Sequence, residues 1–194
     1  MRTFTLFVSI PALTALLGVA AADRLFGNRE LWRGVVLGSW AGLIAAIAYD
    51  VFRLPFVFAK SLGVDSFLPA MNLFKVFPRF GAMILGQPIE QMNYSFAAHA
   101  VGWIYHFSNG ITFGIMYVAM VGCASRRSWT WGVLMAVGLE LGMLLTPYSK
   151  FFSIPVSATF ILVTLAAHTI FGTVMGMVVQ RSSTGMKRVA LLNS

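Results

Sequence analysis

The most informative stretch of the sequence is residues 94–123, YSFAAHAVGWIYHFSNGITFGIMYVAMVGC. It is apolar enough to cross a membrane as a helix, yet it contains His99, His106 and Asn109. Residues seven apart on a helix, such as the two histidines, lie within about 20° of each other around the axis. Because polar groups are costly in hydrocarbon, we predict that this stripe faces protein, a ligand or water rather than lipid.

The composition indicates an α-helical membrane protein of one domain. Of 194 residues, 58% are hydrophobic and 10% are charged, far fewer charges than a soluble domain carries. The apolar runs are twice as long as the strands of a transmembrane barrel, which are about 10 residues. The net charge of +8 comes from Lys and Arg between apolar runs or near the chain ends, which favours a lipid bilayer and not nucleic acid as the partner. The single cysteine, Cys123, excludes an intrachain disulfide.

The apolar runs predict an all-α, polytopic membrane bundle of five transmembrane helices spanning residues 1–194. Their expected positions are about residues 3–22, 34–52, 94–123, 130–147 and 156–180. Residues 64–86 contain apolar pieces too short to span, and we predict short helices there, either interfacial or re-entrant. We also expect a kink at Pro11 in the first helix.

Small residues and charges define the second predicted helix. Gly34, Gly38 and Gly42 are four apart and form a face for close helix packing, within the chain, with other membrane subunits or with a second copy. Asp50 and Arg53 are three apart and suit an ion pair. Across the whole chain, eight Lys and Arg lie in the first loop, the third loop and the tail, against six elsewhere, which predicts an outside N-terminus and a cytoplasmic C-terminus.

Ionisable residues within the predicted spans are the candidate functional groups. Counting along each helix at about 1.5 Å per residue places three of them near the bilayer midplane, namely His106, Glu140 and His168. The same count places two nearer the outer surface, namely Asp50 and His99. We therefore expect the first three to meet at the centre of the bundle.

Such a cluster suggests two roles that do not involve transport. In a structural role, the polar side chains form hydrogen bonds between helices, each worth about 0.6–2 kcal/mol. In a ligand role, His106 and His168 are axial ligands of haem b, and Gly110 and Gly172, one turn away, make room for the macrocycle. Alternatively, His106, Glu140 and His168 bind a divalent metal.

A third role is a path for protons or a small solute, because histidine titrates near neutral pH. Its members would be drawn from the polar residues within the spans: Asp50, His99, His106, Asn109, Glu140 and His168. The sequence has no phosphate-binding loop, dinucleotide fingerprint or nucleophile elbow, so we assign no catalytic residue and expect no enzymatic activity from this chain by itself.

The C-terminal half has a recognisable series of features. Phe113 and Tyr117 follow His106 at offsets of seven and eleven, and a short basic loop with a tryptophan leads to the next helix. The remaining features are Gly132 opening that helix, Pro147 ending it, a central His168 in the last helix, and Arg181 at its exit. In these features the chain resembles the small uncharacterised bacterial inner-membrane proteins of the YagU type, and it differs in having Glu140 and no histidine near the proline. The resemblance implies a bacterial inner membrane and a role in acid tolerance.

From the sequence we therefore predict an inner-membrane subunit or accessory protein whose His/Glu site binds a cofactor or relays protons. The alternatives are a small proton-linked transporter or channel, and a structural bundle without a ligand. A metal-dependent enzyme within the membrane is a more distant alternative.

Overall fold

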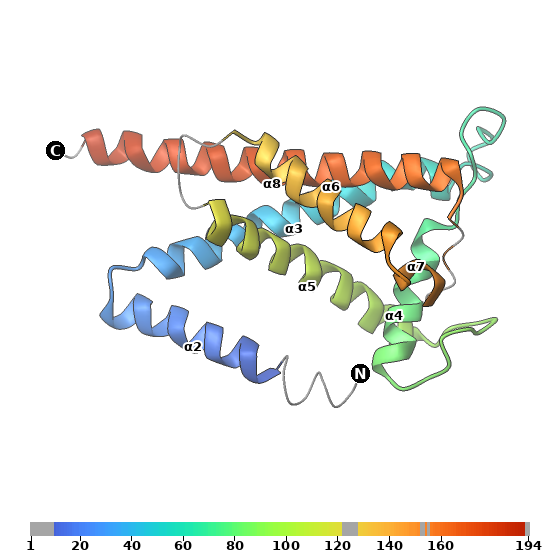
Figure 1. Cartoon of the computed structure of the whole chain (residues 1–194), viewed down its shortest axis with the longest axis horizontal. Coiled ribbons are helices and arrows are strands. Elements are labelled where there is room, and N and C mark those ends of the chain that lie inside the picture. The colour runs from blue at the N-terminus through green and yellow to red at the C-terminus, as the bar shows by residue number, and fades with distance from the viewer. Residues whose placement is uncertain (1–9, 122–127, 152–153, 155, 193–194) are drawn as a thin grey trace.

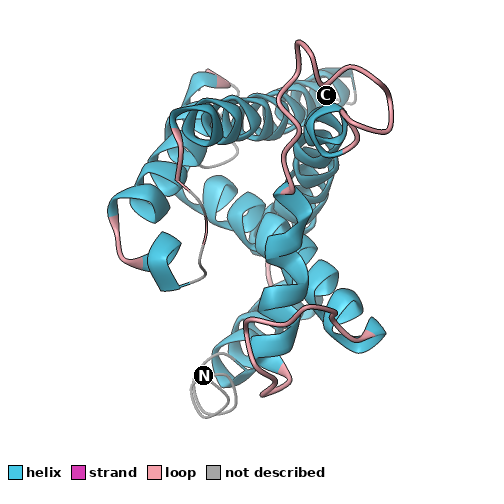
Figure 2. Cartoon of the chain, turned by 90° about the vertical axis from the view of Figure 1, so that its right-hand side faces the viewer, coloured by secondary structure: helices cyan, strands magenta, loops and turns pink. Residues whose placement is uncertain are grey.

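The computed structural model describes residues 10–121, 128–151, 154 and 156–192, and these residues form helices, turns and loops without a strand (Figure 2). The helices are α2 (Ile10–Phe26), α3 (Glu30–Val57), η2 (Leu73–Lys75), α4 (Val76–Ile84), α5 (Phe96–Val121), α6 (Thr130–Leu145), α7 (Tyr148–Phe151) and α8 (Ala158–Leu192). Five long helices thus occupy the five stretches for which the apolar runs predict helices. The predicted first helix lies partly outside the described residues, and its remainder is α2.

Helix α3 is the central element of the bundle (Figure 1). It packs against α5 and against α8, α6 packs on α8, and α4 packs on α5. By contrast, α5 and α6 scarcely touch, although they follow each other in the chain. Helix α2 packs along α3 and lies apart from the other helices in Figure 1. The arrangement therefore leaves a space that α5 and α6 do not close.

Glycines set the distance between α3 and α5. A Cβ built on Gly42 would lie on the carbonyl oxygen of Gly110, and one built on Gly114 would lie on that of Gly38. The two backbones touch because neither helix has a side chain there, which is the close packing predicted from the spacing of Gly38 and Gly42. Gly34, the third glycine predicted for this face, is not in backbone contact, because a Cβ built on it would lie 3.6 Å from a side-chain carbon of Val118, an ordinary van der Waals distance.

Glycines also bring α6 and α8 into backbone contact. A Cβ on Gly132 would lie 2.3 Å from the carbonyl oxygen of Gly172, and one on Gly176 would lie 2.5 Å from that of Trp129. Gly138, also on α6, has open space at the same position. Gly132 therefore lies on the face of α6 that packs closely on α8, and Gly138 does not.

The segment between α3 and α5 folds back over the N-terminal half of α5. Residues 64–86 contain turns, η2 and α4, where short helices were predicted. A Cβ on Gly81 would lie on the carbonyl oxygen of Ala98, and one on Gly102 would lie on that of Phe77, so α4 and α5 are also in backbone contact. Buried Phe77 and Phe80 hold α4 against the bundle.

Two helices of the described residues are long and apolar enough to cross a membrane, α3 and residues 158–182 of α8. Helix α6 is apolar but shorter. Within the apolar window only 33% of the α3 residues and 39% of the α8 residues are buried. The remaining residues of these helices form much of the molecular surface.

Candidate functional site

A cavity of about 790 Å³ lies where α3, α4, α5, α6 and α8 converge. It remains open because α5 and α6 are each packed on a different neighbour and not on each other. Most of its lining is apolar, as is usual for a binding site for a small molecule. Its polar and charged lining includes Tyr49, Arg53, Lys75, His106, Glu140 and His168.

One side of the cavity contains an acid–imidazole pair between α3 and α5. The Nε2 atom of His106 lies 2.8 Å from Oδ2 of Asp50. An ionised carboxylate only accepts hydrogen bonds, so with Asp50 ionised the donor of this bond is the Nε2–H group of His106. Because Asp50 bonds directly to His106, the two lie at the same level of the bundle. Counting residues predicted different levels for them, and that expectation was wrong.

Arg53 is the buried cation of this side, with 3% of its surface exposed. Its Nη1 lies 3.5 Å from Oδ1 of Asp50, which confirms the predicted ion pair. Its Nη2 donates to the carbonyl oxygen of Leu73, 2.5 Å away, and its guanidinium carbon lies 4.7 Å from the centre of the Tyr49 ring. A buried charge is tolerated when it is paired and hydrogen-bonded, and Arg53 is both, although its Nε has no hydrogen-bond partner among the described residues.

The other side contains a second acid–imidazole pair, between α6 and α8. Nδ1 of His168 lies 2.9 Å from the carbonyl oxygen of Thr164 and 3.4 Å from Oε2 of Glu140. A carbonyl oxygen only accepts, so Nδ1 of His168 carries a proton and donates it to Thr164. Glu140 is 2% exposed, and its Oε2 has no hydrogen-bond partner among the described residues. Among the described residues, Oε2 of this buried carboxyl group therefore has only the longer contact to His168.

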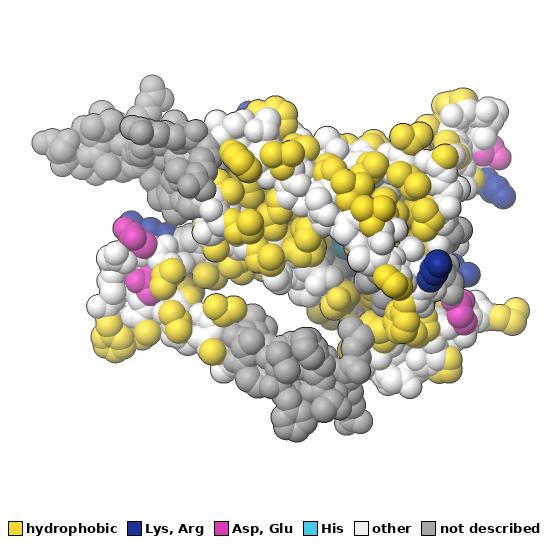
Figure 3. Space-filling view, viewed as in Figure 1, with side chains coloured by type: hydrophobic (Ala, Val, Ile, Leu, Met, Phe, Trp, Pro, Cys, Tyr) yellow, Lys and Arg dark blue, Asp and Glu magenta, His cyan; other side chains and the backbone are white. Residues whose placement is uncertain are grey.

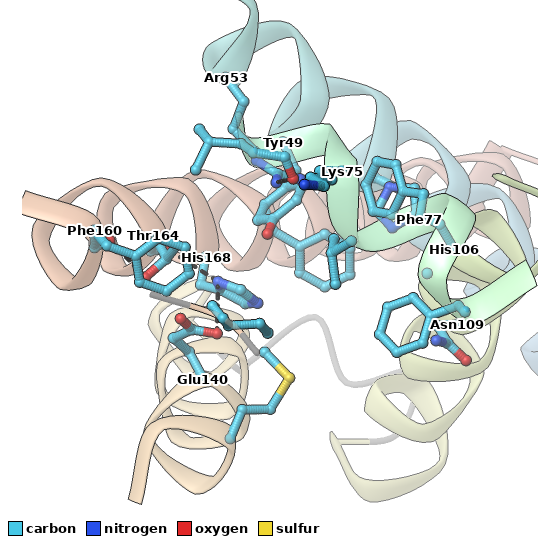
Figure 4. Close-up of a pocket in the computed structure, with 18 of the residues that line it drawn as sticks. Tyr49, Arg53, Lys75, Phe77, His106, Asn109, Glu140, Phe160, Thr164 and His168 are labelled. Carbon is cyan, nitrogen blue, oxygen red and sulfur yellow. Dashed lines mark hydrogen bonds and ion pairs between the residues drawn. The ribbon is translucent and has the colours of Figure 1, made fainter. Parts of the chain in front are cut away.

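Tyr49 stands between the two pairs. The centre of its ring is 5.9 Å from that of His106 and 5.0 Å from that of His168. Figure 4 shows His168 and Glu140 on one side of the pocket and His106 on the other. The three residues predicted to meet, His106, Glu140 and His168, are therefore brought to one cavity, but only Glu140 and His168 are in contact.

The remaining predicted residues differ in position. Asn109 and Gly110 line the cavity, whereas His99 is exposed and has Tyr94 as its neighbouring ring, 6.2 Å between centres. The space beside Gly110 is taken by Ala46 of α3, and that beside Gly172 by α6. The room for a macrocycle that we expected beside these glycines is filled by helices.

Among the described residues, no group of three or more His, Cys, Asp or Glu side chains could hold a metal ion. In particular, His106 is hydrogen-bonded to Asp50 and does not join Glu140 and His168. The arrangement supplies hydrogen-bonding groups and charges rather than a set of converging ligands.

Sequence reasoning missed Tyr49. A signal for it was present, because Ala46, Tyr49 and Arg53 are spaced by three and four and thus share one face of α3. All three line the cavity. The prediction considered only ionisable residues within the predicted spans and therefore did not identify this face.

Comparison with curated proteins finds no match, and comparison with solved structures finds none. Comparison with protein families finds a match over residues 61–188, which begins just after α3 and covers η2, α4, α5, α6 and the larger part of α8. These elements supply most of the cavity wall, including Glu140 and His168. Since the match covers well over half of the chain, the protein belongs to the family of unknown function DUF6789.

Proposed function

We propose that this chain is a multi-pass membrane protein in which the long helices cross the bilayer as a bundle. Its surface supports this proposal, because large apolar side chains on several helices are exposed: Trp40 61%, Ile44 42%, Val51 57%, Ile104 68%, Leu134 61% and Leu162 69%. A soluble protein rarely exposes so much apolar surface. In Figure 3 the hydrophobic side chains cover the middle of the visible face, and the charged ones gather towards its two ends. This is the distribution expected around a hydrocarbon layer.

The location and orientation extend this proposal. We infer a bacterial inner membrane, an outside N-terminus and a cytoplasmic C-terminus, from the loop charges and from the resemblance to proteins of the YagU type. Reporter fusions after Arg181 and within residues 58–72 would then report opposite sides of the membrane. Reporters on the same side would contradict the five-span topology.

Within the bundle, we propose that the protein binds a small amphipathic molecule. The observation that carries this proposal is the cavity of about 790 Å³, with apolar walls and a few buried polar groups. Such a volume is within the range of about 300–1,000 Å³ that is typical of ligand sites. The cavity is also formed largely by the residues that match the family.

To test this binding, we would fill the cavity with a larger side chain on α6. Leu139 is half-buried and lines the cavity, whereas Leu141 lies on the same helix, is 40% exposed and is not part of the lining. We expect Leu139→Trp to lose any molecule that co-purifies with the wild-type protein in native mass spectrometry, and Leu141→Trp to retain it. Equal occupancy in both variants, or no bound molecule in wild-type protein extracted without delipidation, would contradict the proposed binding.

A second candidate function is a proton relay, favoured by the two acid–imidazole pairs on either side of the Tyr49 ring. Histidine exchanges protons near neutral pH, and the cavity can admit water between the pairs. In proteoliposomes with a pH gradient, a relay would be slowed by His168→Gln. A proton flux unchanged in this variant and in His106→Gln would contradict it.

The cofactor predictions can be tested separately by an ultraviolet–visible spectrum and elemental analysis of the purified protein. A Soret band lost in His106→Ala would support haem. A flat visible spectrum and no bound metal would leave the amphipathic ligand and the proton relay as the candidates.

A further inference from the structure

We propose that the ligand of the cavity bears a protonated amine that donates a hydrogen bond to Glu140. This inference rests on the proposed binding function and specifies the chemical class of its ligand. It follows from the isolation of one carboxyl group, the neutralisation of the other charges and the aromatic walls.

The first observation is that Glu140 has too few partners for its burial. It is one of the largest fully buried side chains, with 2% of its surface exposed, and it lines the cavity. Oε2 has no hydrogen-bond partner among the described residues, and its contact with Nδ1 of His168 is 3.4 Å long. That nitrogen already donates to Thr164 at 2.9 Å. A buried carboxyl group without a donor is unfavourable, so a donor from a ligand would satisfy it.

The second observation concerns the other charges of the cavity wall. Arg53 is paired with Asp50 at 3.5 Å, and Arg79 is paired with Glu90 at 3.2 Å. The remaining cation, Lys75, is exposed. Both buried cations of the wall therefore have a carboxylate partner, although Nε of Arg53 has no hydrogen-bond partner among the described residues, whereas Oε2 of Glu140 has no donor there. Beside Glu140 itself, where a carboxyl oxygen has no donor, a positively charged group fits better than a negatively charged one.

The third observation is the aromatic lining. Phe160 and Phe171 line the cavity, and Phe160 lies on the same side as Glu140 in Figure 4. The Tyr49 ring also lines it, but the guanidinium carbon of Arg53 already lies 4.7 Å from its centre. Aromatic faces attract ammonium groups, and the attraction is stronger away from water. The apolar remainder of the lining would hold the hydrocarbon part of the ligand. A carboxyl group, aromatic rings and an apolar wall together suit an amphipathic amine.

The experiment compares three probes of one chain length, decylamine, decanol and decanoate, on the full-length protein in the same detergent. Binding is followed by the rise in the midpoint of thermal unfolding and by counting bound molecules with native mass spectrometry. We expect wild-type protein to bind decylamine at least about tenfold more tightly than decanol, the effect of one charge-assisted hydrogen bond away from water. We expect Glu140→Gln to remove this preference and to bind decanol as the wild-type protein does.

Each outcome decides a separate point. If decanol or decanoate binds the wild-type protein as tightly as decylamine, the amine assignment is wrong, even where Glu140→Gln does not fold. If Glu140→Gln folds and keeps the preference, the amine is held elsewhere and the assignment of Glu140 is wrong. The binding function itself also fails if Leu139→Trp leaves the binding of all three probes unchanged.

Discussion

Replacing Gly114 by alanine is the sharpest test of the packing that positions the site. The Cβ of an alanine at this position would lie on the carbonyl oxygen of Gly38, at a separation below any found between real Cβ atoms and their neighbours. It would also lie 2.7 Å and 2.8 Å from the N and Cα atoms of Gly42. All three are backbone atoms, so no side chain can rotate away and α3 and α5 must separate.

The magnitude follows from two opposing effects. Alanine is a better helix former than glycine by about 1 kcal/mol. Overpacking in a close-packed interior typically costs about 1–3 kcal/mol, and a contact between two backbones belongs at the upper end of that range. Moving the helices apart also loses dispersion along their shared face, because a gap of about 0.5–1 Å forfeits a quarter to a half of each contact. We therefore expect Gly114→Ala to lower the free energy of unfolding by about 2 kcal/mol.

The matched control is Gly138→Ala on α6, where a Cβ has nothing within 4 Å. There only the helix-forming term remains, so this variant should be more stable than wild type by up to about 1 kcal/mol. Thermal or denaturant unfolding of the purified proteins in one detergent measures both. If Gly114→Ala is as stable as Gly138→Ala, α3 and α5 are not in backbone contact and the geometry of the site is wrong.

Two further substitutions test the ion pairs. Asp50→Asn leaves the buried guanidinium of Arg53 without its carboxylate, so we expect the free energy of unfolding to fall by about 3 kcal/mol or more. The control Asp65→Asn changes an exposed residue and should alter that free energy by less than about 0.5 kcal/mol. Equal stability of the two variants would argue against the buried pair. Glu90→Gln removes the carboxylate that pairs with Arg79, but the Glu90 side chain is 58% exposed, so the free energy of unfolding should fall by less than about 1 kcal/mol. A larger decrease would mean that this pair is shielded from water.

The helices and their close packing could be predicted from the sequence. Long apolar runs separated by charged or proline-containing loops predicted the five long helices, because helix ends in such a chain are marked by polar and helix-breaking residues. The spacing of Gly38 and Gly42 predicted a close contact, although it did not identify Gly110 and Gly114 as the partners. The sequence of one helix shows which of its faces consists of small residues, but only the fold shows which helix packs against that face.

The pairing within the site could not be predicted in the same way. Counting residues from expected helix ends separated Asp50 from His106, yet these two side chains are hydrogen-bonded at 2.8 Å. The error arose because α3 runs on to Val57, past the expected end, and because helices in a bundle are shifted along one another. Counting residues along the predicted spans also could not position α4, whose residues complete the cavity wall.

The proposed binding requires a cavity that remains between α5 and α6 and presents Glu140 to a ligand. The most direct test is an experimental structure of the full-length protein in lipid nanodiscs with decylamine. We predict density for the probe in this cavity, with its amine beside the Glu140 carboxyl group and Tyr49 nearby. A structure in which α5 and α6 close against each other, or in which Glu140 faces lipid, would contradict the account.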